Sequence, residues 1–164
     1  MHFCIRKGKI SIIINNLKYM KSEKELKIMG VKFELIFLTQ AHDGQVICNC
    51  EASEIIKTLV FIGSNPVIVL IPVDKRVNIA KIEELTAEKD LRMAKPAEVL
   101  ALTGYNVGTV SPFGINPTIK QIADNSFLML SSLFFGSGKG DVIIKISQNE
   151  FSKSFRGTFA SISE

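Results

Sequence analysis

The stretch of sequence that decides the fold lies at residues 54–63 and reads Glu-Ile-Ile-Lys-Thr-Leu-Val-Phe-Ile-Gly. It is rich in β-branched and aromatic residues and short enough to be a buried strand. Lys57 interrupts it. An ammonium group that enters an apolar interior loses its hydration, which is costly unless an anionic group replaces the water. We therefore expect Lys57 either to extend to the surface or to meet an anionic ligand.

A glycine-rich segment farther along the chain is the natural partner for this strand. Residues 103–114 read Thr-Gly-Tyr-Asn-Val-Gly-Thr-Val-Ser-Pro-Phe-Gly, with three glycines and a proline in a segment that is not polar. Gly108 and Gly114 allow the main chain to approach a ligand or to adopt a positive φ, and Pro112 stiffens the turn between them. The segment predicts a rigid loop with an accessible backbone.

The two motifs together, Lys-Thr-Leu-Val-Phe at 57–61 and Thr-Gly-Tyr-x-Val-Gly-x-Val-Ser-Pro-Phe-Gly at 103–114, resemble the YbaK/EbsC family. Its members are free-standing relatives of the editing domain that is inserted in bacterial prolyl-tRNA synthetases. The resemblance extends from Ser22 to the C-terminus. It implies an N-terminal extension at 1–21 and a single editing domain at 22–164, built as a mixed, barrel-like β-sheet surrounded by short helices.

The pattern of the chain independently predicts an α+β fold, because short strands alternate with short helices without regular βαβ spacing. Capping boxes at Ser22/Glu25 and Ser147/Glu150, the N-cap Asn78, and Pro96 with Gly104 mark boundaries of four helices. The segment 10–14 either adds a strand to a sheet edge or belongs to a disordered extension. We expect helices at 23–29, 42–51, 79–85 and 97–103 and one ending near 155, and strands at 31–38, 55–62, 66–71, 91–93, 119–123, 133–135 and 142–146.

Composition indicates one globular domain of 164 residues, with 46% hydrophobic and 22% charged residues. No apolar stretch approaches the ~20 residues that a membrane-spanning helix needs, and no signal peptide is recognisable, which favours a cytoplasmic protein without membrane contact. The three cysteines, Cys4, Cys48 and Cys50, lack C-x-x-C spacing. We expect reduced thiols and neither a disulfide framework nor a metal site.

The net charge of +4 is unevenly distributed along the chain. Residues 1–32 carry eight Lys or Arg and two Glu, whereas the remainder carries twelve basic and fourteen acidic side chains. The basic stripe in the first helix is compatible with contact to a phosphate backbone, and equally with a solvated helix face.

Conventional hydrolytic groups are not recognisable in the sequence. Ser111 precedes Pro112 and does not form a nucleophile elbow, and His42 is the one plausible base partner. The glycine-rich turn at 136–140 lacks the G-x-x-x-x-G-K-[ST] pattern of a phosphate loop and indicates a hairpin turn that can border a site. A substrate that brings its own reactive groups suits such a chain, and an aminoacyl-tRNA ester is one.

The resemblance implies a trans-acting aminoacyl-tRNA deacylase that hydrolyses mischarged tRNA by substrate-assisted ester hydrolysis, without a cofactor. Lys57 would anchor the ester end through the terminal phosphate or the developing oxyanion, and Gly108 would hold the aminoacyl group with its main chain. Both are the predicted catalytic residues. The expected substrate-binding residues are Thr58, Thr109, Ser111, Pro112, Gly114, Ser137 and Gly138.

The expected substrate is tRNA(Pro) carrying cysteine or alanine at its 3′ end, and prolyl-tRNA synthetase is a possible partner. A synthetase cannot reject a smaller amino acid by binding alone, because one methylene contributes only ~1–3 kcal/mol. Two alternatives remain open at this point. One is a non-catalytic module of the same fold that binds tRNA or a synthetase, and the other is a protein-interaction domain in which Lys57 extends into solvent.

Overall fold

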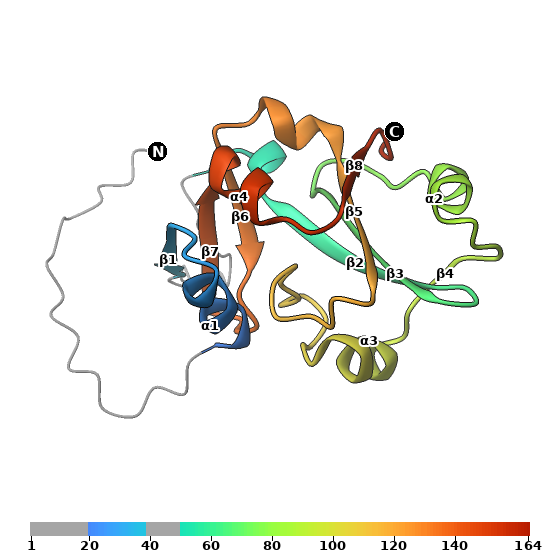
Figure 1. Ribbon diagram of the computed structural model, residues 1–164, viewed down its shortest axis with the longest axis horizontal. Coiled ribbons are helices and arrows are strands. Elements are labelled where there is room, and N and C mark those ends of the chain that lie inside the picture. Colours follow the sequence, from blue (N-terminus) through green and yellow to red (C-terminus); the bar gives the residue numbers. More distant parts are fainter. Residues whose placement is uncertain (1–19, 39–49) are drawn as a thin grey trace, which may run out of the picture.

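The computed structural model of the protein describes residues 20–38 and 50–164. It contains two β-sheets with short helices around them (Figure 1). The smaller sheet has the strand order β1-β7-β6 and the larger has the order β4-β2-β3-β5-β8. The strands are β1 (Phe33–Phe37), β2 (Ile56–Ile62), β3 (Pro66–Pro72), β4 (Arg92–Met93), β5 (Lys120–Asp124), β6 (Ser132–Gly136), β7 (Val142–Ser147) and β8 (Thr158–Ala160).

The hairpin of β2 and β3 is the centre of the larger sheet. The two strands are antiparallel, and Lys57 lies opposite Ile71. β3 and β5 are parallel, as are β5 and β8. β4 covers only the far end of β2, where it pairs with Phe61 and Ile62. The near end of β2 therefore has an edge that β4 does not cover.

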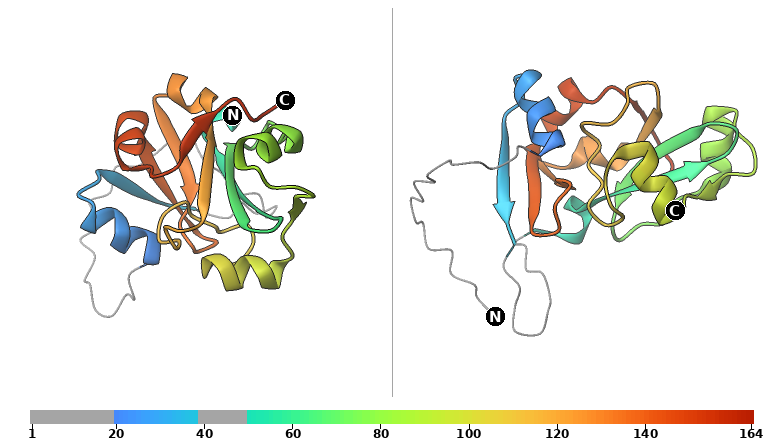
Figure 2. Two further views of the ribbon diagram at one scale, coloured as in Figure 1. Left: turned by 45° about the vertical axis from the view of Figure 1, so that its right-hand side comes forward. Right: turned by 90° about the horizontal axis from the view of Figure 1, so that it is seen from below.

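The two sheets meet at a parallel bridge between Ile55 and Phe134, and in the part of the chain that the structure describes they do not close into a barrel. Figure 2 shows the smaller sheet beside the larger one rather than stacked on it. The predicted α+β class, with a mixed sheet and short outer helices, is confirmed.

The main hydrophobic core contains a group of phenylalanines whose rings contact one another. Phe151, on the helix α4 (Gln148–Ser154), is fully buried and stacks on Phe135 of β6 with ring centroids 5.0 Å apart. Phe113, from the glycine-rich loop, meets both rings edge to face. Aromatic pairs of this kind contribute about 0.5–1.5 kcal/mol beyond the burial of their area. The loop is thus anchored in the core at residue 113.

Three of the predicted helices begin and end where their capping residues lie. Asn78 accepts a hydrogen bond from the amide of Lys81 at the start of α2 (Ile79–Thr86). Gly104, with φ of 72°, ends α3 (Pro96–Thr103). Ser147 accepts from the amide of Glu150 at the start of α4. These three boundaries are confirmed.

The first helix, α1 (Lys21–Ile28), begins differently from the prediction. Met20 is its N-cap and makes no side-chain cap hydrogen bond. The predicted capping box of Ser22 and Glu25 is wrong, because both side chains bind other segments: Ser22 donates to the carbonyl of Ser137, and Glu25 accepts from the amide of Gly114. Tertiary contacts thus replace the local ones.

Other predictions have mixed outcomes. The predicted helix at 42–51 and the segment 10–14 lie outside the described residues. Cys50 is disulfide-bonded, so the expectation of reduced thiols is wrong for this residue. The strand β8 and the 3₁₀ turns η1 (Ala52–Glu54) and η2 (Asn125–Met129) were not predicted. Over 20–38 and 50–164, no helix is both long and apolar enough to span a membrane.

Candidate functional site

The glycine-rich loop connects α3 to β5 and has the backbone geometry that its glycines predict. Gly108 has φ of 85° and Gly114 has φ of 73°, values that favour glycine. A β-carbon at Gly114 would lie 2.7 Å from the hydroxyl of Tyr105, whereas one at Gly108 would meet no protein atom within 4 Å. The two glycines therefore differ: Gly114 permits close packing, and Gly108 borders open space.

Helix α1 and Tyr105 fix the far half of this loop. The Tyr105 hydroxyl donates to the carbonyl of Phe113 at 2.6 Å, and burial raises the pKa of Tyr105 to about 12. The ammonium of Lys21 lies 5.1 Å from the centre of the Tyr105 ring. Together with the bond from Gly114 to Glu25, these contacts hold residues 113 and 114 against α1.

The hairpin turn between β6 and β7 packs against the same loop. The amide of Gly138 donates to the carbonyl of Thr109 at 2.8 Å. A β-carbon at Gly136 would lie 2.7 Å from the Thr109 carbonyl oxygen, so glycine is required for this approach. Gly136, the first residue of this turn, lines the cavity described next.

A cavity of about 270 Å³ lies between the uncovered edge of β2, helix α3 and the glycine-rich loop. We call it the β2-edge pocket. Its wall is largely apolar. The lining residues are Ile56, Lys57, Thr58, Leu59, Val60, Met93, Ala94, Val99, Val107, Gly108, Val110 and Gly136.

Thr58 is the polar side chain that stands out in this pocket. Its hydroxyl oxygen is buried and has no hydrogen-bond partner among residues 20–38 and 50–164. Thr58 shares a strand face with Ile56 and Val60, both of which belong to the core cluster that includes Val110 of the loop. A buried hydroxyl without a partner is unfavourable in the folded protein, which is the signature of a group that meets a ligand or a water molecule.

Lys57 binds main-chain carbonyls, which is neither of the two arrangements expected from the sequence, the surface or an anionic ligand. It is half-buried, and its ammonium donates to the carbonyls of Val73 at 3.3 Å and Lys75 at 2.6 Å. Neighbouring strand residues point to opposite faces, so the Lys57 side chain leaves β2 on the face of Phe61, opposite to Thr58. Among the residues that the structure describes, no carboxylate pairs with it.

The remaining predicted substrate-binding residues lie around the loop, outside the β2-edge pocket. The hydroxyls of Thr109, Ser111 and Ser137 have partners within the protein: the first donates to Asn106, the second accepts from the amide of Phe113, and the third donates to Val142. Pro112 lines a second cavity on the other side of the loop. Gly114 and Gly138 pack against Tyr105.

The apolar wall of the pocket was not singled out from the sequence. Val107 and Met93 are 59% and 58% exposed at its rim, and Val99 closes it from α3. Exposure of large apolar side chains beside a cavity indicates a binding surface, but valine and methionine carry no chemical motif in the sequence. No cluster of three metal-ligating side chains occurs over 20–38 and 50–164.

Comparison with known proteins agrees with this architecture. The model of the family described as the aminoacyl-tRNA editing domain matches residues 39–153. The chain belongs to the aminoacyl-tRNA editing domain family. This assignment confirms the resemblance drawn from the two motifs.

The chain is also similar to parts of larger proteins of known sequence. It is 29% identical over 128 residues to a proline–tRNA ligase of Oleidesulfovibrio alaskensis, covering 75% of this chain and 22% of the ligase. The match to the Thermotoga maritima ligase is 36% over 90 residues, 54% of this chain and 15% of the ligase. The chain therefore spans less than a quarter of the length of each of these relatives.

Two crystal structures have the same fold over most of the chain. Hypothetical protein APE2540 superposes with a TM-score of 0.75 at 30% identity, covering 88% of this chain and 99% of the other. A candidate trans-editing enzyme for prolyl-tRNA synthetase superposes with a TM-score of 0.75 at 22% identity, covering 88% and 95%. The second likeness shows the fold alone.

Proposed function

We propose that this editing-domain protein is a trans-acting deacylase that removes the amino acid from mischarged tRNA, with the β2-edge pocket as the site of hydrolysis. The family assignment supports the reaction class. The observation that carries the location is the buried, unpartnered hydroxyl of Thr58 in an apolar cavity beside the accessible backbone of Gly108.

The reaction demands little from protein side chains. Water adds to the ester carbonyl, the bond between that carbon and the ribose oxygen breaks, and the ribose oxygen takes up a proton as the free amino acid leaves. The ester is already activated, and the neighbouring ribose hydroxyl lies beside its carbonyl. Positioning and electrostatic stabilisation are then sufficient for hydrolysis.

Each polar group at the pocket has a proposed part in this reaction. The Thr58 hydroxyl binds the polar atoms of the aminoacyl group, and the main chain at Gly108 holds its other side. The ammonium of Lys57 exchanges the carbonyls of Val73 and Lys75 for the phosphate or the developing oxyanion of the substrate. Lysine is suited to this exchange, because its charge sits on a flexible four-carbon stem.

The pocket wall supports selection by size. Val60, Val99 and Val110 present branched apolar side chains that limit the space for the aminoacyl group. We propose that cysteine and alanine are accepted on tRNA(Pro) and that proline is rejected by steric exclusion, which supplies the second sieve that binding in a synthetase cannot. Because its relatives include proline–tRNA ligases, prolyl-tRNA synthetase is the proposed partner.

The test is a deacylation panel with Cys-, Ala-, Ser- and Pro-tRNA(Pro), using the wild-type protein and Lys57→Ala. We expect the wild type to hydrolyse Cys- or Ala-tRNA(Pro) and not Pro-tRNA(Pro). The deacylation rate of Lys57→Ala should be much lower. Absence of turnover above background with every mischarged tRNA would refute the enzyme assignment.

One observation favours a second function, that of a non-catalytic tRNA-binding module. The Lys57 ammonium is already held by two main-chain carbonyls, so in such a module it would have no part in chemistry. The same panel separates the two functions, since a binding module would protect the ester from spontaneous hydrolysis instead of accelerating it.

A further inference from the structure

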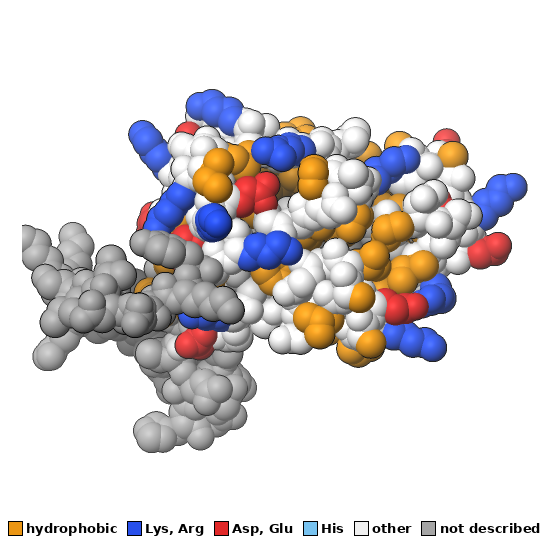
Figure 3. All heavy atoms as spheres, turned by 60° about the horizontal axis from the view of Figure 1, so that its bottom comes forward, with side chains coloured by type: hydrophobic (Ala, Val, Ile, Leu, Met, Phe, Trp, Pro, Cys, Tyr) orange, Lys and Arg blue, Asp and Glu red, His pale blue; other side chains and the backbone are white. Residues whose placement is uncertain are grey.

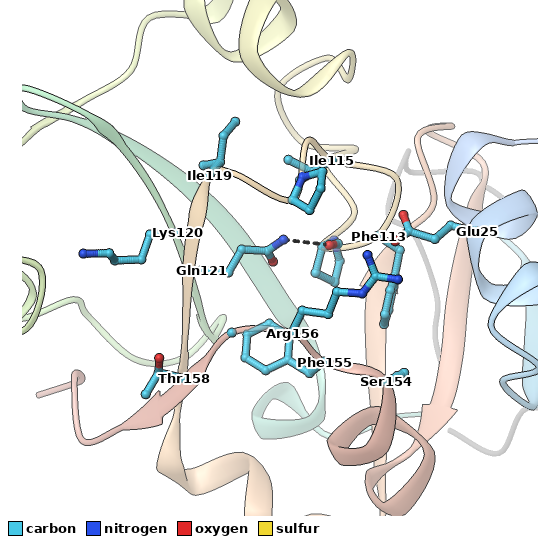
Figure 4. Close-up of a pocket in the computed structure, with 13 residues that line it drawn as sticks. Glu25, Phe113, Ile115, Ile119, Lys120, Gln121, Ser154, Phe155, Arg156 and Thr158 are labelled. Atoms are coloured by element: carbon cyan, nitrogen blue, oxygen red, sulfur yellow. Dashed lines mark hydrogen bonds between the residues drawn. The ribbon is translucent and has the colours of Figure 1, made fainter.

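A second cavity, of about 130 Å³, lies on the other side of the glycine-rich loop (Figure 4). We call it the Arg156 cavity. Its floor is formed by β5 and its walls by the end of the loop, by α1 and by the segment between α4 and β8. The lining residues are Glu25, Pro112, Phe113, Ile115, Pro117, Ile119, Lys120, Gln121, Ser154, Phe155, Arg156, Gly157 and Thr158.

Gln121 presents a fixed hydrogen-bond acceptor in this cavity. Its Nε2 donates to the carbonyl of Pro112 at 3.2 Å, which sets the orientation of the amide, because a flipped amide would place two acceptors against each other. The other amide atom, Oε1, is buried and has no hydrogen-bond partner in the described part of the chain. A buried acceptor of this kind calls for an N–H or O–H donor from a ligand or from water.

Arg156 presents the complementary donors. It is exposed at the mouth of the cavity, and the described part of the chain provides no ion pair or hydrogen bond for its guanidinium. Figure 4 shows the guanidinium turned towards Glu25, one of whose oxygens accepts from the amide of Gly114. Lys120, in contrast, points away from the cavity and donates to the carbonyl of Thr86.

The cavity thus combines one buried acceptor, one forked donor and the Glu25 carboxylate, which binds the Gly114 amide, with apolar walls from Pro112, Pro117 and Ile119. A flat ring with an amino group beside two acceptor atoms matches this set, because a guanidinium binds two neighbouring acceptors at once. Cytosine has this edge in its 4-amino group, N3 and O2. Uracil places a carbonyl where cytosine has the amino group, which would set two acceptors against each other at Gln121.

We propose that the Arg156 cavity binds a cytosine of single-stranded RNA, one of the unpaired cytosines that precede the terminal adenosine of tRNA. This proposal rests on the proposed deacylase function for the identity of the RNA. Proteins read unpaired bases through their Watson–Crick edges in this manner. The amino group binds Gln121 Oε1, and Arg156 binds the two acceptors.

The position of the cavity fits this assignment. The same loop lines both sites, with Val107, Gly108 and Val110 at the β2-edge pocket and Pro112 and Phe113 at the Arg156 cavity. An RNA end whose last nucleotide enters the first site can cross the loop and place an earlier base in the second. On the face seen in Figure 3, Lys and Arg side chains are spread among hydrophobic ones, as suits a strand that presents both phosphates and bases.

The experiment compares a minimal substrate with a complete one. Aminoacyl-adenosine lacks the cytosines, and aminoacyl-tRNA contains them. For Arg156→Ala and for Gln121→Met we expect kcat/KM on Cys-tRNA(Pro) to fall by about tenfold through KM, with hydrolysis of cysteinyl-adenosine unchanged. Replacing each cytosine of the tRNA end by uracil in turn should reduce kcat/KM for the wild type at one position and have no further effect on the variants.

The control variant is Lys89→Ala, which removes an exposed cation from the loop between α2 and β4, outside both cavities. This change should leave kcat/KM for both cysteinyl-adenosine and Cys-tRNA(Pro) unchanged. The proposal is overturned if Arg156→Ala behaves like Lys89→Ala, or if no cytosine replacement matters.

If the wild type hydrolyses neither substrate, the deacylase function fails, and the cavity is then tested by binding. Fluorescence anisotropy with short RNAs ending in C-C-A or in the uracil-substituted sequences should show a preference for cytosine that Arg156→Ala and Gln121→Met abolish. Equal affinities for all these RNAs would overturn the cytosine site independently of any activity.

Discussion

The two sides of the glycine-rich loop have opposite chemical character. The β2-edge pocket is larger and largely apolar, with the unpartnered hydroxyl of Thr58 in its wall. The Arg156 cavity is smaller and combines an amide, a guanidinium and a carboxylate with apolar residues. An apolar pocket suits discrimination by size, and a polar cavity suits recognition of a base edge. Under the two proposals, the loop separates the selection of the amino acid from the binding of the RNA.

The largest expected effect of a single change is at Lys57. Removing one electrostatic group from a hydrolytic site typically lowers kcat by about 10²–10³-fold, and we predict a loss of this order for Lys57→Ala on aminoacyl-tRNA. An equal loss on aminoacyl-adenosine, which has no phosphate, would assign Lys57 to the oxyanion, and a loss confined to the tRNA would assign it to the terminal phosphate. The melting temperature should change little, because the carbonyls of Val73 and Lys75 lie near the surface, where water can replace the ammonium. Full activity in single-turnover assays would remove Lys57 from the mechanism.

Gly108→Ala tests whether the loop backbone borders the substrate. The new β-carbon meets no protein atom within 4 Å, so the change costs about 1 kcal/mol through the positive φ alone. Gly30→Ala is the matched control, because Gly30 has φ of 69°, equally open surroundings and no place in either cavity.

We expect both glycine variants to lose similar stability in urea titrations, while only Gly108→Ala loses deacylation, by about tenfold or more. Equal activity of the two would show that residue 108 serves the turn and not the substrate.

Thr58→Val separates function from stability at the β2-edge pocket. Valine replaces the unpartnered hydroxyl by a methyl group, so the folded protein should be equally stable or up to about 1 kcal/mol more stable, with deacylation about tenfold slower. Thr103→Val is the control: that hydroxyl is buried and donates to the carbonyl of Val99 at 2.7 Å, so its loss should destabilise the protein by about 1 kcal/mol. A Thr58→Val protein that is less stable but fully active would contradict the assignment.

Tyr105→Phe tests the side of the loop that faces the Arg156 cavity, and it should have the smallest effect on deacylation. It removes the bond to Phe113, which lines the Arg156 cavity, and should raise KM for tRNA a few-fold without changing hydrolysis of aminoacyl-adenosine. A change confined to the small substrate would contradict the separation of the two sites.

The pH dependence of stability tests the same contact. Burial raises the pKa of Tyr105 from 10.0 to about 12, so the neutral form is favoured in the folded state. The contribution of Tyr105 to the free energy of unfolding is fully present below pH 10.0, the pKa of the unfolded state. It is lost as the pH rises through about 12, the pKa of the folded state. Urea titrations at pH values between 10.0 and about 12 should show that stability falls more steeply with pH for the wild type than for Tyr105→Phe.

Much of the fold could be predicted because local signals agree with the final structure. The apolar runs of β2 and β3 and the caps at Asn78 and Gly104 are determined within a few residues. The Ser22/Glu25 capping box failed because both side chains have stronger partners far away in the sequence, at Ser137 and Gly114. β8 escaped prediction because three residues carry too little periodicity.

The candidate site was only partly predictable, because part of it depends on contacts between segments that are far apart in the sequence. Lys57, Thr58 and Gly108 line one pocket, and the motifs that contain them could be recognised in the sequence. The direction of the Lys57 side chain could not be predicted from the sequence, since it depends on the register of β2 with β3 and on the carbonyls of the turn after β3. Gln121 and Arg156 come together only through the parallel pairing of β5 with β8, which no local pattern encodes.

The division between the two sides of the loop is tested most directly by NMR titration with a non-hydrolysable cysteinyl-adenosine amide. We predict that the amide signals of Thr58, Gly108 and Val110 shift, and that those of Gln121 and Arg156 shift only when the analogue is extended by the preceding cytosines. Shifts at Gln121 and Arg156 with the short analogue, and none at Thr58 and Gly108, would contradict the proposed division.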